Sequence, residues 1–304
     1  MTKAHSKGHF IMKKVWTIVI SVSAAVLVAG AAGVGGFLVG QNVFAQKKDY
    51  SKYDIATVED DYSDVFNKFK KTDASKYFTT FNEHELANIA LLKQKEVENY
   101  YSVSKGEVLA AGVTQSIRSN FIKNGNNYFE ENISASSFVK VAGRFYQGEN
   151  IEHFKGDFVD VEKGKYSDDK KIDYSKSEFD EKWGRTLDRG TIYIISSKTF
   201  IDGEVLSNSD NTYSIKLDLD PTYSVLRYIK QMIETSGLSQ APIFHSVKLE
   251  FVVDSELNLL KFITDEVYDV HMVIDAKDSH ASLTQTFTYG TKNIPSLDED
   301  AIYE

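Results

Sequence analysis

The sequence of 304 residues predicts an α+β protein: an N-terminal transmembrane helix, then helices packed on a large curved antiparallel sheet. Three observations predict this fold class. An apolar segment without charge runs between Lys14 and Lys47. Apolar residues then recur at helical spacing through residues 57–98, and from about residue 100 they alternate, with turn residues between the runs. Helices that precede an antiparallel meander are typical of α+β proteins and not of alternating α/β chains.

The apolar segment near the N-terminus is long enough to cross a bilayer. A transmembrane helix needs about 20 apolar residues, whereas the core of a signal peptide has about 7–15. Lysines and no acidic residue precede the segment, so we expect residues 1–14 in the cytoplasm, residues 15–40 in the cell membrane and the bulk of the chain outside. The alternative is a signal peptide cleaved after Ala45, which would give a secreted protein.

Small residues recur every four positions within this segment. The spacing is that of a helix dimerisation face, so transmembrane-helix self-association is one prediction, with the ordinary composition of membrane helices as the alternative. The residues concerned are Ala25, Ala29 and Gly33, and Ala32, Gly36 and Gly40.

Composition limits the chemistry and the partners of the exported part. The chain has no cysteine, which excludes a disulfide framework, a thiolate nucleophile, a cysteine-ligated metal and a lipid-modified cysteine. Residues 1–48 carry six lysines and no acid, which leaves 29 basic against 44 acidic residues in the rest of the chain, a net charge of −15. Nucleic-acid binding needs clustered positive charge, so we expect no nucleic-acid partner.

The helical region follows a linker over residues 41–56. Within residues 57–98, Asn82 and Glu85 stand at the spacing of a capping box and predict the start of a helix. His84 falls in the first turn of that helix and is predicted to lie on the surface. The metalloprotease motif HExxH fails here, because the position four residues after His84 is Asn88.

Residues 99–292 predict an antiparallel β-rich domain, followed by an acidic tail over 293–304. Asn124-Gly125 between two alternating runs is the strongest hairpin signal in the chain. A short helix is expected within SKSEFDEKWGRTLD, residues 175–188. The run TIYIISSKTF, residues 191–200, predicts a strand that turns at Asp202-Gly203 into the next strand.

Asp218 and Asp220 could be a catalytic or metal-binding pair, or the end of a strand and the start of a helix. Leu217 and Leu219 point to one side of the predicted strand, so Asp218 points to the other, toward solvent. Asp220 directly precedes Pro221, which predicts an N-cap for a helix inserted over residues 221–235. We therefore interpret the pair as structural.

Sequence motifs for catalysis are missing. The chain has no glycine-rich phosphate loop outside the apolar segment, no GxSxG and no calcium-binding loop. We therefore expect no enzyme, no cofactor and no metal site. A catalytic site assembled in space from distant residues stays open at this point.

Aromatic residues are plentiful, with 17 Tyr and 19 Phe. An ordinary aromatic core is one interpretation. The other is a sheet that curves around a cavity for a lipid-like or other hydrophobic ligand, since ligand pockets are mostly apolar with few polar groups. Periodicity of the apolar face selects the candidate cavity residues: Leu217, Leu219, Val225, Ile229, Leu249, Phe251, Val253, Phe262, Tyr268 and Phe287.

The order of elements in the C-terminal half carries a resemblance. TYSIKLDLDPTYSVLRYIKQM, HSVKLEFVVDSELNLLKFITDEVYDV and SLTQTFTYG follow one another as strand and helix, strand and long strand, and a threonine-rich strand. Over about residues 100–290 this resembles the bacterial lipoprotein-carrier superfamily, which includes LolA-like carriers, RseB and the LppX/LprG lipoproteins. The resemblance implies an incomplete barrel over helices, with an apolar cavity for acyl chains. The missing lipid-modified cysteine and the expected membrane anchor argue against a shuttle between membranes.

The sequence therefore predicts a membrane-anchored extracytoplasmic binding protein without catalysis, which holds a lipid-like or hydrophobic ligand between sheet and helices. The alternative is an envelope sensor or regulatory ectodomain that acts through a protein partner. Its 14-residue cytoplasmic tail is too short to fold, so such a protein would need a partner in the membrane.

Overall fold

A computed structural model of the chain describes residues 55–136, 140–148, 151–158, 171–183, 185–236, 240–270 and 276–296. The predicted tail, membrane segment, dimerisation face and cleavage site all lie outside these residues, as does most of the acidic C-terminal tail. In the described part of the chain, no helix combines the length and the apolar character that a membrane span requires.

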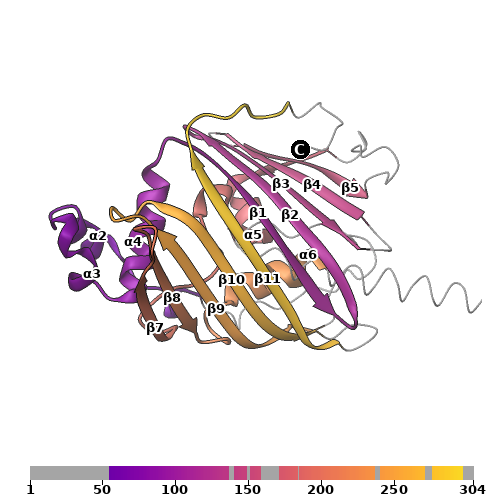
Figure 1. The fold of residues 1–304 in the computed structure, drawn as a ribbon. Coiled ribbons are helices and arrows are strands. Elements are labelled where there is room, and N and C mark those ends of the chain that lie inside the picture. Colours follow the sequence, from indigo (N-terminus) through magenta and orange to yellow (C-terminus); the bar gives the residue numbers. More distant parts are fainter. Residues whose placement is uncertain are drawn as a thin grey trace, which may run out of the picture.

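One antiparallel sheet of eleven strands dominates the described residues, in the order β6-β5-β4-β3-β2-β1-β11-β10-β9-β8-β7 (Figure 1). The strands are β1 (Asn99–Ala110), β2 (Val113–Asn124), β3 (Asn127–Ala135), β4 (Lys140–Gln147), β5 (Ile151–Phe158), β6 (Lys171–Ser175), β7 (Phe200–Ser207), β8 (Tyr213–Leu219), β9 (Ile243–Val253), β10 (Leu259–Val270) and β11 (Ala276–Tyr289). The large antiparallel sheet with few helices is confirmed. Among the described residues the two edge strands, β6 and β7, are not paired with each other, so the sheet does not close into a barrel.

The chain enters this sheet at its centre. β1 pairs with β2 on one side and with β11 on the other. From β1 to β6 the strands step outward to one edge, and from β7 to β11 they step back from the opposite edge. The segment between β6 and β7 must therefore cross the whole width of the sheet, which brings residues 176–199 over one face.

The helices α4 (Glu83–Glu96), α5 (Lys176–Trp183) and α6 (Leu226–Ser236) lie on that same face (Figure 1). The shorter helices α2 (Ser63–Phe69) and α3 (Tyr77–Thr80) lie beside α4, beyond the edge of the sheet. The predicted capping box of α4 is confirmed: Asn82 Oδ1 accepts a hydrogen bond from the Glu85 N–H, and Glu85 Oε2 accepts one from the Asn82 N–H, both at 3.0 Å. This pairing satisfies two N–H groups that a helix start leaves without partners.

The core divides into a large part and a smaller aromatic part. The large part lies under α4 and α6, where Leu86 and Ile89 of α4 are fully buried against β8 and β10. The aromatic part lies under α5, where the rings of Phe179 and Trp183 stack at 4.5 Å and contact Phe145 of β4. The short helix predicted within residues 175–188 is thus confirmed as α5.

The predicted strand over residues 191–200 is wrong. β7 begins only at Phe200, and residues 191–199 are irregular backbone. Consecutive side chains from Ile192 to Ile195 are all buried, so there is no alternation between an inner and an outer face. An irregular segment that is covered on both sides has the same composition as a buried strand. Each of them buries several consecutive apolar residues.

The predicted turn at Gly203 is also wrong, because β7 runs straight through it. A Cβ at Gly203 would lie 2.7 Å from the Lys216 carbonyl oxygen and 3.1 Å from Glu83 Cβ. Glycine is thus required for close packing against the start of α4 and not for a turn. The hairpin at Asn124-Gly125 is confirmed, since β2 and β3 meet there and Gly125 has a φ of +58°.

The inserted helix starts later than predicted, at Leu226 and not at residue 221. Asp220 does cap backbone N–H groups, but those of a turn: its Oδ1 accepts hydrogen bonds from Thr222 at 2.8 Å and Tyr223 at 2.9 Å. Asp218 lies on the outer face of β8, in register with Lys248. The described residues contain no group of three or more acidic or histidine side chains placed to hold a metal ion.

Candidate functional site

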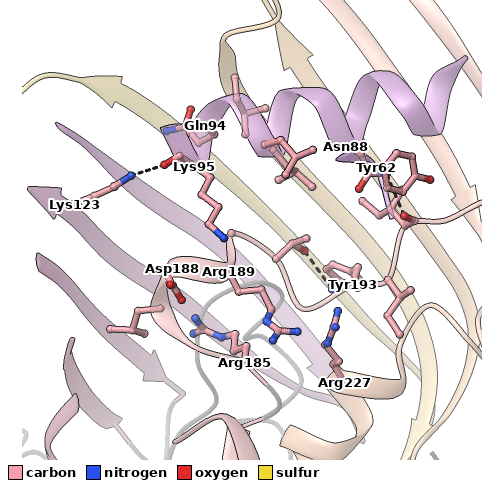
Figure 2. A pocket seen from close by; sticks show the side chains of 18 of the residues that line it. Tyr62, Asn88, Gln94, Lys95, Lys123, Arg185, Asp188, Arg189, Tyr193 and Arg227 are labelled. Carbon is pink, nitrogen blue, oxygen red and sulfur yellow. Dashed lines mark hydrogen bonds between the residues drawn. The ribbon is translucent and has the colours of Figure 1, made fainter. Parts of the chain in front are cut away.

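A pocket of about 400 Å³ lies between α4, the inner face of the sheet and residues 185–195 (Figure 2). Residues 59–66, which lead into and begin α2, form a further wall. The pocket exists because residues 176–199 cross the sheet beneath α4. It is thus a product of the strand order, which forces that crossing.

Much of the pocket wall is apolar and aromatic. Leu91 and Leu92 of α4 line it together with Phe121 of β2, Tyr128 of β3 and Phe287 of β11. Since inward-facing side chains of neighbouring strands lie side by side, the sheet supplies a continuous aromatic surface. Tyr100, Leu187, Tyr193, Ile194, Ile195 and Leu259 complete the apolar lining.

Arginine is concentrated at the pocket. Three of the five arginines in the chain, Arg185, Arg189 and Arg227, line it, although lysine supplies 30 of the 35 basic residues. Figure 2 shows their guanidinium groups gathered on the side opposite α4. The guanidinium fork keeps its charge when buried and binds planar anions through two hydrogen bonds, which lysine does not do.

Arg185 has a structural role within the wall. Its Nη2 donates to both carboxylate oxygens of Glu130, at 2.7 and 2.9 Å, and the two side chains are only 4% and 1% exposed. A buried charge of this kind needs a paired countercharge. Glu130 therefore neutralises Arg185 and leaves the other two arginines to face the pocket.

Arg189 and Arg227 repel each other. Burial lowers the pKa of Arg227, and the positive charge of Arg189 lowers it further. Arg227 donates to Glu59, whose side chain is 40% exposed, while Arg189 Nη2 lies 3.5 Å from an oxygen of the half-exposed Asp180. The Arg227 side chain is only 12% exposed and Glu59 neutralises it, whereas the pair of Arg189 with Asp180 is exposed on both sides and therefore weak, so the charge of Arg189 is only partly compensated.

A second pair of like charges comes from Lys95 and Lys123. Lys123 Nζ donates to the Lys95 carbonyl oxygen at 2.6 Å, and burial, followed by the Lys95 ammonium, lowers the pKa of Lys123. Figure 2 shows the Lys95 side chain extending from α4 into the pocket. Within the described ranges its ammonium group has no hydrogen-bond or ion-pair partner.

The acidic residues of the lining equal the basic ones in number, but they are held in local bonds. Besides Glu59 and Glu130, Asp60 Oδ2 accepts from the Ser197 N–H at 2.7 Å, and Asp61 Oδ1 accepts from the Ser63 N–H at 2.9 Å. Asp188 accepts from Lys176 at 2.9 Å and from Thr186. These partners lower the pKa values of Asp60 and Asp188 against the effect of burial. The carboxylates are therefore satisfied where they stand.

A buried carboxyl group lies beside the pocket wall. The Tyr193 hydroxyl donates to Oε1 of Glu266 on β10, a fully buried residue. Burial raises the pKa of Glu266 to about 8. In the described structure Glu266 Oε2 and the Tyr268 hydroxyl have no hydrogen-bond partner. Strand alternation would have located Glu266, because it shares its face with Phe262 and Tyr268.

The structure gathers nine of the ten predicted cavity residues into the large core, fully or nearly buried: Leu217, Leu219, Val225, Ile229, Leu249, Phe251, Val253, Phe262 and Tyr268. Of the ten, Phe287 is the residue that lines the pocket. Ligand contact by these residues stays a prediction. The arginines were missed by sequence reasoning, although their scarcity and the spacing of Arg185 and Arg189 were visible signals.

His84 was predicted on the surface but is half-buried beside this region. Its Nδ1 lies 2.8 Å from the Tyr62 hydroxyl, its ring packs against Phe200, and burial lowers its pKa. Among the described lining residues of the pocket there is no histidine. The site as described offers charge, hydrogen bonds and apolar surface.

No protein-family model matches the chain, and no curated protein matches its sequence. Among solved structures, the chain is similar to a DUF1329 family protein from Desulfovibrio piger, with 10% identity and a TM-score of 0.24, over 68% of this chain and 91% of that one. An N-terminal dehydratase from the difficidin assembly line is similar at 9% identity and a TM-score of 0.15, over 67% and 82%. Scores this low carry no argument about function.

Proposed function

We propose that the chain is a membrane-anchored extracytoplasmic binding protein that holds one small amphipathic molecule in the pocket beneath α4, without chemical conversion. The single observation that carries the proposal is the pocket itself, a hollow with many apolar and aromatic residues and with charged groups among its lining residues. Apolar walls with a few placed polar groups are typical of ligand sites.

The size of the pocket limits the ligand. Ligand pockets span roughly 300–1,000 Å³, and about 400 Å³ lies near the lower end of that range. A single small molecule fits such a volume. The lining supports an amphipathic ligand in particular, since Leu91, Phe121 and Phe287 favour an apolar body while Arg189 and Lys95 favour a polar end.

Native mass spectrometry tests this proposal. Residues 49–304, which include every described residue, would be expressed with export and purified without detergent. The mass of the native protein would be measured, and the bound material would then be extracted with solvent. We expect one small molecule per chain. A blocking variant, Leu91→Trp, places a large ring in the pocket and should abolish the added mass.

The matched control is Leu206→Trp, at an exposed position on β7. It adds the same ring outside the pocket and should keep the ligand. An unliganded mass for the unmodified protein, together with no thermal shift on adding lipids or fatty acids, would contradict the proposal and turn the search toward a protein partner.

A further inference from the structure

We propose that the ligand of this pocket carries an anionic head group, a carboxylate or a phosphate, bound by Lys95 and Arg189. The inference rests on the proposed function and names the chemical class of its ligand. The same head group occurs on fatty acids and on lipid phosphates, so the chemistry that they share is what the pocket would recognise.

Positive charges gathered around the pocket support an anion. Figure 2 shows Arg189 beside Arg227, and the carboxylate that pairs with Arg189, Asp180, is half-exposed. Lys95 lies on α4 close to Lys123, whose pKa is lowered by burial and then by the Lys95 charge. An anion placed between Lys95 and Arg189 would be attracted to both and would offset the repulsion among the cations.

Two cations have donors that no protein group uses. Lys95 is an exposed residue whose three N–H donors have no protein partner within the described residues, and Figure 2 shows its side chain extending from α4 toward the pocket. Arg189 makes one contact at 3.5 Å, which leaves donors of its guanidinium fork available. A carboxylate or phosphate accepts several such bonds at once, and bonds of this charged type are the strong ones.

The acidic lining residues do not compete for this position. Glu130 is occupied by Arg185 and Glu59 by Arg227. Asp60, Asp61 and Asp188 are held by Ser197, Ser63 and Lys176. A cationic ligand would have to displace these bonds, and a neutral ligand would leave the repulsions in place. An anion is the ligand class that uses the donors that are free.

The test compares probes that differ only in the head group. The full chain in a neutral non-ionic detergent would be titrated with dodecanoate, dodecyl phosphate, dodecanol and inorganic phosphate, with binding measured by equilibrium dialysis of labelled probe. We expect both anionic amphiphiles to bind at least about tenfold more tightly than dodecanol. Lys95→Gln/Arg189→Gln should remove this difference while dodecanol binding stays unchanged.

Detergent without protein controls for micelle partition. The matched control for total charge is Lys216→Gln/Lys248→Gln, which removes two exposed lysines on the outer face of the sheet. It should behave as the unmodified chain does. Equal binding of dodecanol and dodecanoate would overturn the anionic head group and leave the proposed function standing. Inorganic phosphate bound as tightly as dodecyl phosphate would overturn the inference as well, and no binding of any amphiphile would overturn the proposed function itself.

Discussion

The Tyr193 hydroxyl, on the segment that forms the pocket wall, donates a hydrogen bond to the buried carboxyl group of Glu266 at the centre of β10. This bond joins an irregular segment to the rigid sheet beneath it. Glu266 is fully buried, and burial raises its pKa to about 8, so the group is neutral when the protein is most stable.

The first prediction is a loss of stability with rising pH. The unfolded chain releases the Glu266 proton near pH 4.5, whereas the folded protein keeps it until about pH 8. Between these values the folded state binds one proton more, so the free energy of unfolding falls as pH rises, by up to about 1.4 kcal/mol per pH unit from this group. Urea denaturation from pH 5 to pH 8 would measure it.

Glu266→Gln should remove that dependence, because the amide cannot ionise and its oxygen can still accept from Tyr193. The control is Glu250→Gln, on the outer face of β9, which should keep the slope. A slope that is the same in Glu266→Gln and in the unmodified protein would show that Glu266 does not titrate in this range.

The second prediction concerns the buried ion pair between Arg185 and Glu130. Removing one partner leaves an uncompensated charge in the core, so Arg185→Met should lower the free energy of unfolding by about 3–5 kcal/mol. Arg185→Met/Glu130→Met removes both charges and should recover part of this loss. Lys70→Met, in the exposed pair with Glu96, should cost less than about 1 kcal/mol. A double variant no more stable than Arg185→Met would contradict the charge argument.

The third prediction tests the close approach of β7 to α4. Gly203→Ala brings a Cβ within 2.7 Å of a backbone oxygen and 2.9 Å of the Phe200 ring, so we expect a loss of about 1–3 kcal/mol in chemical denaturation. Gly148→Ala is the comparison, because its Cβ would meet only Asn127 Oδ1 at 3.7 Å. Similar unfolding energies for the two variants would remove the packing reason for glycine at 203.

The fourth prediction concerns the start of α4, which carries the pocket residues Leu91 and Lys95. Asn82→Ala removes the side-chain acceptor of the capping box and should cost about 1 kcal/mol. Asn82→Asp retains an acceptor and should cost much less. Thermal denaturation of both variants measures the difference. Equal melting temperatures for Asn82→Ala and Asn82→Asp would show a general effect of substitution and not the loss of the cap.

The features that the sequence determined by itself are local ones. Asn124-Gly125 sets a turn because glycine takes the positive φ there, and Asn82 with Glu85 starts α4 because the two groups lie within one helical turn. Alternation along β8 to β10 places Leu217, Phe251 and Phe262 inside. Each of these depends on neighbours in the chain, so the pattern carries the information.

Tertiary structure decided the rest. Residues 191–199 form part of the pocket wall and not a strand, because the crossing from β6 to β7 buries them on both sides. That crossing follows from the strand order, which the local sequence pattern does not encode. Arg189 and Arg227 come from opposite sides of β7 and β8 in the sequence, and Lys95 comes from α4. Their charges meet because the sheet brings distant segments together, and no spacing along the chain encodes that meeting.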